Sequence, residues 1–203
     1  MGAVVLALTI FALVGVVLEH RTVAHAVGAE VAGTGVLELP ALGGNSGAPP
    51  HGVTVDDGMV PDGVTAFDYG FPAVTNLDPD LRSAVRKATT AAARDGVEIG
   101  VNSGWRSSAY QDQLLREAIS QYGSEEEAAR WVATADTSPH VRGDAVDLGP
   151  REATEWLSEH GRAYGLCQIY RNEPWHYELR PGAAHHGCPA PYADPTHDPR
   201  MHR

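Results

Sequence analysis

Apolar residues recur at three- and four-residue intervals after Asp78, a pattern that predicts an amphipathic helix. Asp78 can accept hydrogen bonds from the first free N–H groups, and the following proline is favoured in a first helical turn. Asp95-Gly96 is expected to end the helix, because glycine tolerates the left-handed conformation of a C-terminal cap. Apolar and polar residues then alternate from Val97 to Val101, which predicts a half-buried strand. The apolar positions of the helix are Leu81, Ala84, Val85, Ala88 and Ala92.

Helical and strand patterns alternate through the rest of the central region. Ser124, followed three residues later by Glu127, forms a capping box, and Gly165 marks the end of a helix. Short strands separated by helices predict an α+β fold, with a small, largely antiparallel sheet and helices packed on one face. The expected helices are 108–121, 124–132 and 152–164, and the expected strands are 145–148, 167–170 and 175–179.

The first 26 residues have the composition of a signal peptide or a membrane anchor. Residues 2–18 contain no charged side chain, and Ala24-His25-Ala26 matches the small-x-small pattern of a signal peptidase site. The apolar run is at the short end of the length that a membrane span needs, so both a cleaved signal and an uncleaved anchor are open. Either one places the following residues outside the cytoplasm and limits membrane contact to this segment.

Three regions follow this leader. Residues 27–63 are rich in Gly, Ala, Pro and Val without a helical period, which is typical of a flexible linker. Residues 64–189 contain the helix and strand patterns and are expected to form the folded domain. Several prolines interrupt the C-terminal end, so residues 190–203 are expected to form an irregular tail.

Composition narrows the classes of function. The 203-residue chain has 15 Lys and Arg against 26 Asp and Glu, which argues against binding to nucleic acid or to anionic lipid head groups. Ten histidines against two cysteines favour imidazole and carboxylate metal ligands over a thiolate site. In an exported chain Cys167 and Cys188 predict a disulfide, whereas two free thiols are expected only in the cytoplasm.

Two segments carry residues suited to a metal site. His140 and Asp147 lie seven positions apart, and a turn at Gly143 followed by a strand would place both side chains on one side. On the strand at 175–179, His176 points away from its apolar neighbours and toward the same cleft. Two imidazole nitrogens and one carboxylate oxygen form a three-ligand zinc set that leaves a fourth position for water.

Residues next to these ligands have the chemistry of a hydrolase. Glu173 lies three positions before His176, outside the ligand set, and is expected to act as general base toward zinc-activated water. Arg106 follows the Val97 strand and could hold a substrate carboxylate or the oxyanion that forms when water attacks a carbonyl. Glu178 shares a strand face with His176, where it either orients a ligand or is a solvated edge residue.

Three motifs in matching order resemble the VanY-type D-alanyl-D-alanine carboxypeptidases. They are Ser103-Gly104-Trp105-Arg106, the pattern S-x-H-x-x-G-x-A-x-D from Ser138 to Asp147, and E-P-W-H from Glu173 to His176. The resemblance covers roughly residues 64–180, and wider relatives include VanX dipeptidases, L,D-carboxypeptidases and the hedgehog-like zinc fold. It implies an α+β fold like that of the hedgehog and D-Ala-D-Ala peptidase domains.

The resemblance also assigns roles residue by residue. It makes Glu173 the catalytic base and Arg106 the residue that stabilises the transition state. Ser138 lies where the family contacts substrate, and Gln111 fits the extended arginine motif as a further substrate-binding residue. The implied ligands of a single zinc ion are His140, Asp147 and His176.

The resemblance implies an exported zinc carboxypeptidase that faces the cell wall and removes the terminal D-alanine from peptidoglycan stem peptides; we expect a monomer. An L,D-carboxypeptidase or a peptidoglycan endopeptidase would use the same residues. A zinc-containing domain that binds cell-wall peptide without cleaving it is disfavoured, because both Glu173 and Arg106 are present. A structural protein that keeps these motifs without using them is the hypothesis least consistent with a complete set of ligand and catalytic residues.

Overall fold

The computed structural model describes residues 52–202 of the chain. The predicted leader at residues 1–26 and the predicted linker up to residue 51 lie outside the described residues. Between residues 52 and 202, no helix is both long enough and apolar enough to cross a lipid bilayer.

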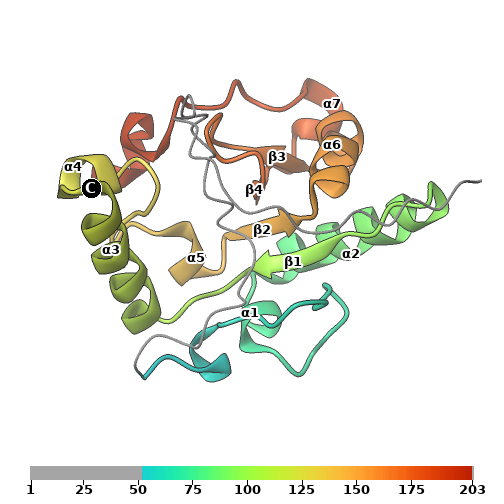
Figure 1. Cartoon of the computed structure of the whole chain (residues 1–203). Coiled ribbons are helices and arrows are strands. Elements are labelled where there is room, and N and C mark those ends of the chain that lie inside the picture. Colours follow the sequence, from blue (N-terminus) through green and yellow to red (C-terminus); the bar gives the residue numbers. More distant parts are fainter. Residues whose placement is uncertain (1–51, 203) are drawn as a thin grey trace, which may run out of the picture. The chain divides into compact units, whose positions relative to one another are not determined.

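A four-stranded antiparallel sheet lies at the centre of the fold, with strand order β1-β2-β4-β3 (Figure 1). Asp147 of β2 pairs with His176 of β4 on one side and with Ser103 of β1 on the other. The register therefore brings together the three segments that carry the sequence motifs. The strands are β1 (Gly100–Ser103), β2 (Ala145–Gly149), β3 (Leu166–Gln168) and β4 (His176–Leu179).

Strand β1 is displaced from the alternating segment Val97–Val101 that predicts it. Regular pairing begins at Gly100, which lies opposite Gly149, the last residue of β2. Because β2 ends there, residues 97–99 have no partner strand among the described residues and form the connection from the preceding helix. The other three predicted strands are confirmed, each with its ends shifted by no more than two residues.

Two helices cover the apolar face of the sheet. Helix α2 (Pro79–Arg94) is capped by Asp78, whose carboxylate accepts hydrogen bonds from the N–H groups of Asp80 and Leu81. All five apolar positions predicted for α2 are buried, which confirms the amphipathic pattern. Helix α6 (Arg151–His160) packs beside α2, and both contact the strands. The sheet contributes Val146, Leu148 and Tyr177 to the core beneath them.

The other elements are one further long helix and several short turns. Helix α3 (Ser108–Tyr122) is capped by the Ser107 hydroxyl and was expected at this position. Helix α4 (Glu125–Ala128) ends earlier than predicted, because the chain continues in tight turns after Ala128. One helical turn, α5 (Pro139–Arg142), has no counterpart among the predicted helices. The remaining elements are η1 (Val55–Asp57), α1 (Pro72–Thr75), η2 (Gly161–Tyr164), α7 (Ala183–His186), η3 (Pro195–His197) and η4 (Pro199–His202).

Segments on both sides of the predicted domain also pack against it. Val53 and Val60 lie in the segment assigned to the linker, yet both are buried, and Val60 belongs to the main core. In the tail, Tyr192 pairs with Tyr170, and two 3₁₀ turns follow. The buried tail residues include Asp194, Pro195 and Asp198. Residues 53–63 and 190–202 are thus part of the folded structure.

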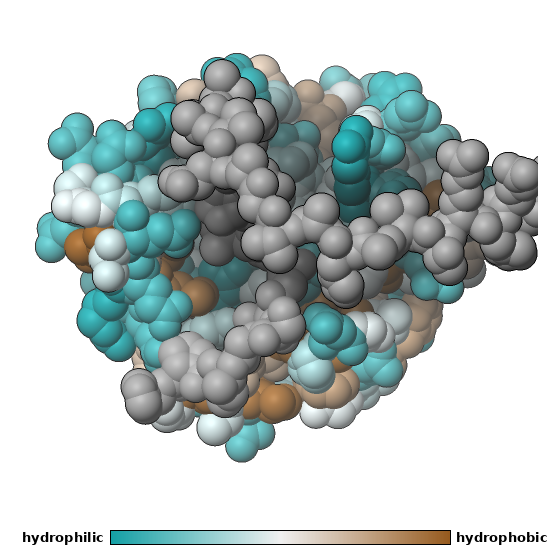
Figure 2. All heavy atoms as spheres, in the orientation of Figure 1, coloured by the Kyte–Doolittle hydropathy of each residue, from teal (hydrophilic) through white to brown (hydrophobic). Residues whose placement is uncertain are grey.

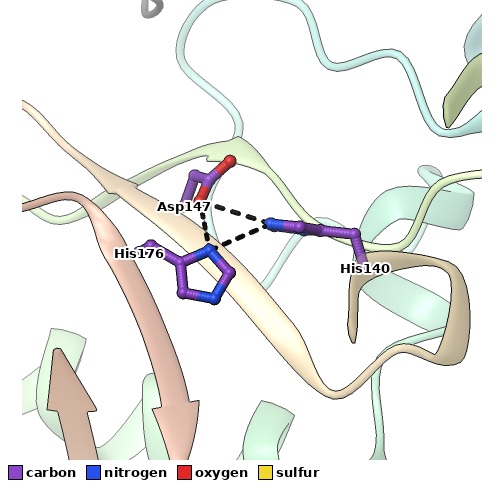
Figure 3. Close-up of side chains that lie close together, drawn as sticks. All are labelled: His140, Asp147 and His176. Carbon is purple, nitrogen blue, oxygen red and sulfur yellow. Dashed lines mark hydrogen bonds and ion pairs between the residues drawn. The ribbon is translucent and has the colours of Figure 1, made fainter. Parts of the chain in front are cut away.

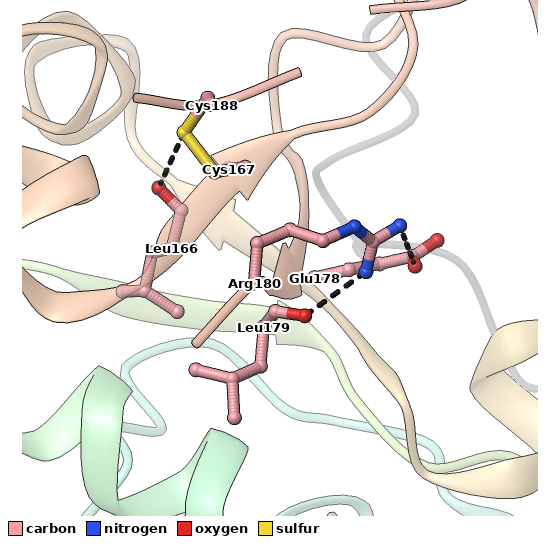
Figure 4. The surroundings of a disulfide bond; sticks show 6 residues. All are labelled: Leu166, Cys167, Glu178, Leu179, Arg180 and Cys188. Carbon is pink, nitrogen blue, oxygen red and sulfur yellow. Dashed lines mark hydrogen bonds and ion pairs between the residues drawn. A yellow bond between two sulfur atoms is a disulfide. The ribbon is translucent and has the colours of Figure 1, made fainter. Parts of the chain in front are cut away.

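A disulfide bond joins Cys167 of β3 to Cys188, which confirms the prediction from the cysteine pair (Figure 4). The bond closes a segment of the chain with a sequence separation of 21 residues. It therefore anchors the start of the tail to the edge of the sheet.

The described surface is mostly hydrophilic in the view of Figure 2, with hydrophobic side chains in smaller groups. Isolated exposed apolar residues are normal on protein surfaces and carry no functional signal by themselves. The large exposed ones are Val55, Phe67, Tyr69 and Tyr192.

Candidate metal centre

Three predicted ligands converge beside the sheet, on the side opposite the core residues Val146, Leu148 and Tyr177 (Figure 3). His140 lies on α5, Asp147 on β2 and His176 on β4. Gly143 makes this possible, because its φ of +78° ends α5 and turns the chain into β2. His140 Nε2 lies 3.2 Å from His176 Nδ1, and Asp147 Oδ1 lies 3.4 Å and 3.3 Å from these two nitrogens.

Hydrogen bonds on the outer side of each imidazole fix its tautomer. His140 Nδ1 lies 2.8 Å from the carbonyl oxygen of Gly104, so this nitrogen must carry the proton and donate. His176 Nε2 lies 3.3 Å from Glu178 Oε1 and donates to it for the same reason. When both imidazoles are neutral, the lone pairs of His140 Nε2 and His176 Nδ1 therefore point at each other and at Asp147 Oδ1. This arrangement favours a positive charge between the three atoms.

The spacing of these atoms fits a tetrahedral zinc ion. Ligands at about 2.0–2.1 Å from a tetrahedral ion are about 3.3–3.4 Å from one another. The three observed separations are 3.2, 3.4 and 3.3 Å. Asp147 Oδ1 is buried and has no hydrogen-bond donor among residues 52–202, as expected for an oxygen that faces a metal ion. The residues present therefore fit zinc.

The local charges also favour a cation at this point. Burial raises the pKa of Asp147, but His140, His176 and Arg106 outweigh it and hold the pKa well below its usual value. Burial and the Arg106 guanidinium lower the pKa of His140. Burial also opposes a charge on His176, but the carboxylates of Asp147 and Glu178 beside it raise its pKa to about 10. The site thus keeps Asp147 ionised and stabilises one positive charge at the nitrogen that faces it.

Arg106 is held by three side chains and controls the second oxygen of Asp147. Its Nη2 donates to Asp147 Oδ2 at 2.8 Å, its Nε to Ser103 Oγ at 2.8 Å, and its Nη1 to Gln111 Oε1 at 3.2 Å. Gln111 is buried and donates in turn to the carbonyl oxygen of Ala133 at 2.8 Å. Asp147 is therefore oriented with Oδ2 toward Arg106 and Oδ1 toward the two imidazoles.

Glu173 and Ser138 line the same cleft, and each has a side-chain oxygen without a hydrogen-bond partner among residues 52–202. Glu173 Oε2 lies 3.6 Å from His176 Nδ1, while its Oε1 is buried without a hydrogen-bond partner among residues 52–202. Burial raises the pKa of Glu173 to about 8. The Ser138 hydroxyl is also buried and has no partner in the described part of the chain. The cleft has a volume of about 320 Å³, so both groups are available to a small substrate.

Residues outside the ligand set support the centre, and of these Arg200 was not singled out by the sequence. The carbonyl of Gly104 orients His140, and a side chain here would collide with the carbonyl oxygen of Ala73, 2.1 Å from the position of a Cβ atom. Glu178 is buried and bonded to His176, which decides between the two interpretations of this residue. Arg200 binds Glu178 from the tail. No local pattern links Arg200 to the site, because the contact joins distant parts of the sequence.

The profile of the VanY family, D-alanyl-D-alanine carboxypeptidase, matches residues 74–181, more than half of the chain. A D-alanyl-D-alanine carboxypeptidase of Enterococcus faecalis is 32% identical over 112 residues, which cover 43% of this chain and 42% of that protein. The chain therefore spans less than half the length of this curated relative.

Two solved structures are similar to this chain. VanYB in complex with D-alanine-D-alanine superimposes with a TM-score of 0.52 at 24% identity, over 72% of this chain and 91% of that chain, which shows a common fold. A zinc(II) complex of a mutant VanY D,D-pentapeptidase from a VanB-type vancomycin resistance cassette is 28% identical, with a TM-score of 0.48 over 51% of this chain and 72% of that chain. The match to the family profile, together with the fold, shows that this chain belongs to the VanY family of D-alanyl-D-alanine carboxypeptidases.

Proposed function

We propose that this chain is a zinc-dependent D-alanyl-D-alanine carboxypeptidase that removes the terminal D-alanine from peptidoglycan stem peptides. One observation carries the proposal: three acceptor atoms face one another beside a buried Glu173 oxygen that has no partner among residues 52–202. Membership of the VanY family supports the reaction type. The D-alanine-D-alanine bound to VanYB supports the class of substrate.

In this proposal His140, Asp147 and His176 hold one zinc ion per chain. When bound, zinc lowers the pKa of a coordinated water toward neutrality and polarises a carbonyl group. The protein keeps the three ligand atoms in place before any metal arrives, because Gly104, Arg106 and Glu178 each hold the far side of one ligand.

Glu173 serves as the proton carrier. A water molecule attacks the carbonyl carbon of the terminal amide and gives a proton to the Glu173 carboxylate. Glu173 then returns this proton to the departing amine nitrogen as the carbon–nitrogen bond breaks. Because burial raises the pKa of Glu173, its carboxylate binds a proton more strongly than an exposed carboxylate would, which suits a proton acceptor.

Arg106 and Ser138 position the substrate. Three of the five guanidinium N–H donors of Arg106 are used by Ser103, Gln111 and Asp147, which leaves two for the oxyanion that develops on the attacked carbonyl. The unpartnered Ser138 hydroxyl is suited to hydrogen-bond the peptide backbone or the terminal carboxylate. Gln111 acts on the substrate through Arg106, whose side chain it holds.

We further propose that the enzyme works outside the cytoplasm, secreted or anchored by its N-terminal segment and facing the cell wall. The Cys167–Cys188 disulfide supports this location, because such bonds persist in oxidising compartments. The substrate class supports it as well, since stem peptides are part of the wall.

The decisive assay is hydrolysis of a pentapeptide that ends in D-Ala-D-Ala, followed by mass spectrometry. We expect release of the terminal D-alanine, loss of activity with a chelator and recovery with added zinc. Tetrapeptide stems and cross-linked peptides serve as parallel substrates. Cleavage confined to the tetrapeptide would indicate an L,D-carboxypeptidase, and cleavage confined to cross-links would indicate an endopeptidase. Binding of the pentapeptide without cleavage would contradict the proposed enzyme.

A further inference from the structure

We propose that Arg200, in the C-terminal tail, is a positioning residue for the metal centre that acts through Glu178 on His176. The proposal rests on the metal site described above. The family profile ends at residue 181, so it assigns no role to the tail. In this proposal the tail supports the metal centre through Arg200.

The first step is the contact between Arg200 and Glu178. Arg200 Nη1 lies 2.6 Å from Glu178 Oε2, and Nη2 lies 3.0 Å from Oε1, so the guanidinium grips both carboxylate oxygens. Only 1% of the Glu178 side chain is exposed. A carboxylate buried to this degree needs donors for both of its oxygens, and the Arg200 guanidinium supplies one to each. Arg180 adds one contact of 2.9 Å, to Oε2 alone, and the two arginine side chains are similarly exposed, at 28% for Arg200 and 33% for Arg180 (Figure 4).

The second step leads from Glu178 to the metal ligand. Glu178 Oε1 accepts the hydrogen bond from His176 Nε2 at 3.3 Å, and this bond turns the lone pair of Nδ1 toward Asp147 and His140. An ionised acceptor raises the basicity of a ligating imidazole and fixes the plane of its ring. The orientation of Glu178 therefore sets how His176 faces a metal ion.

A second contact fixes Arg200 itself. Arg200 Nε donates to Asp198 Oδ2 at 2.9 Å, and Asp198 is buried. The Tyr170 hydroxyl donates to the same Asp198 oxygen at 3.1 Å, while the Tyr170 ring lies 4.9 Å from the ring of His176. A closed ring of contacts therefore runs from His176 to Glu178, Arg200, Asp198 and Tyr170 and back to His176. We name Glu178, Arg200, Asp198 and Tyr170 the tail clamp.

The tail is held at several points before it reaches the clamp. Cys167, which the disulfide joins to Cys188, pairs across the strands with Glu178 itself (Figure 4). Tyr192 then forms backbone hydrogen bonds with Ile169 and Arg171. Asp194 is buried and lies 3.3 Å from Arg130. These contacts fix the path of the tail, so that Arg200 lies beside Glu178, behind the metal ligand His176.

The test measures zinc affinity, by competition with a chromophoric chelator, in the full chain and in Arg200→Ala and Arg200→Lys. We expect the alanine variant to bind zinc about 10- to 100-fold more weakly, the range typical of residues that hold a metal ligand. The lysine variant should recover part of this loss, because lysine keeps the charge but lacks the planar two-pronged donor. The visible absorption bands of the cobalt(II)-loaded protein should shift in both variants.

Arg151→Ala is the matched control. Arg151 also pairs with a carboxylate, that of Glu155 at 2.7 Å, but both side chains are largely exposed and lie on α6. We expect wild-type zinc affinity and an unchanged cobalt spectrum. Circular dichroism of the metal-free proteins establishes that each variant is folded.

Two results would overturn the role of the tail: zinc affinity within twofold of wild type in folded Arg200→Ala, or a cobalt spectrum identical to wild type. If the alanine variant does not fold, Arg200→Lys and Glu178→Gln decide the question, and wild-type affinity in both rejects the proposal. A wild-type protein that binds no zinc would instead refute the proposed metal centre.

Discussion

The metal centre and the tail clamp are both polar and largely buried, and His176 of the metal centre contacts the clamp, but their hydrogen bonding differs. In the metal centre, the inner oxygen of Asp147 and one oxygen of Glu173 have no donor among residues 52–202. In the tail clamp, both oxygens of Glu178 and both of Asp198 receive donors. Buried acceptors without donors are costly unless something outside the chain completes them. The first cluster therefore has the features of a binding site, and the second has those of a support.

Removal of a metal ligand should have the largest effect. His140→Ala should lose zinc and reduce D-alanine release to the level of chelator-treated wild type, because two remaining ligands do not form a closed set. Metal analysis and the pentapeptide assay measure both. His160→Ala is the control, since this histidine stacks on Trp156 away from the cleft. Retention of zinc by His140→Ala would remove it from the ligand set.

Replacement of the proton carrier should separate metal binding from turnover. Glu173→Gln keeps the shape of the side chain but not its basicity, so we expect turnover to fall about 10²- to 10⁴-fold. Zinc content should match wild type, because Glu173 is not a ligand in this account. A glutamine variant with wild-type turnover would exclude the role of general base.

Removal of the Arg106 guanidinium from the cleft should reduce turnover somewhat less than replacement of Glu173. Arg106→Ala should lower kcat about 10²- to 10³-fold, the range for a group that stabilises a developing oxyanion. It also leaves Asp147 Oδ2 without the donor that orients it. Steady-state kinetics with zinc in excess separates the two effects, and an increase confined to KM would limit Arg106 to substrate binding.

The tail clamp predicts a change in stability that depends on pH. Arg200→Ala breaks a buried ion pair and should lower the free energy of unfolding of the metal-free protein by about 3 kcal/mol at pH 7. Burial raises the pKa of Asp198, but its bonds to Arg200 outweigh this and lower it below 3.8. A carboxyl with a lowered folded-state pKa stabilises above its unfolded value and loses this effect as pH falls. The gap between wild type and variant should therefore shrink below about pH 3.8.

Urea unfolding in the presence of a chelator, at pH 7 and again near pH 3.5, measures this gap. Arg151→Ala should change stability by less than about 1 kcal/mol at either pH, as is usual for an exposed ion pair. An Arg200→Ala effect that is equal at both pH values would show that Asp198 does not depend on Arg200 for its ionisation.

The residues of the metal centre could be predicted because local rules place them. Strand alternation puts Asp147 and His176 opposite their apolar neighbours, and the structure pairs the two directly. The helical period predicted every buried position of α2. Both signals are contained in short windows of sequence.

Other features depend on partners far away in the chain. The start of β1 is set by where β2 ends, so alternation alone placed that strand too early. The tail is short of regular structure and rich in proline, so its composition predicts an irregular segment. Its order comes instead from contacts with Tyr170, Glu178 and the disulfide, which no local pattern contains.

Zinc titration of Glu173→Gln and His140→Ala side by side tests the central claim most directly. The account predicts that the glutamine variant binds one zinc ion per chain with wild-type affinity, while the alanine variant binds none under the same conditions. The reverse result, or equal binding by both variants, would contradict a centre built from His140, Asp147 and His176 with Glu173 outside the ligand set.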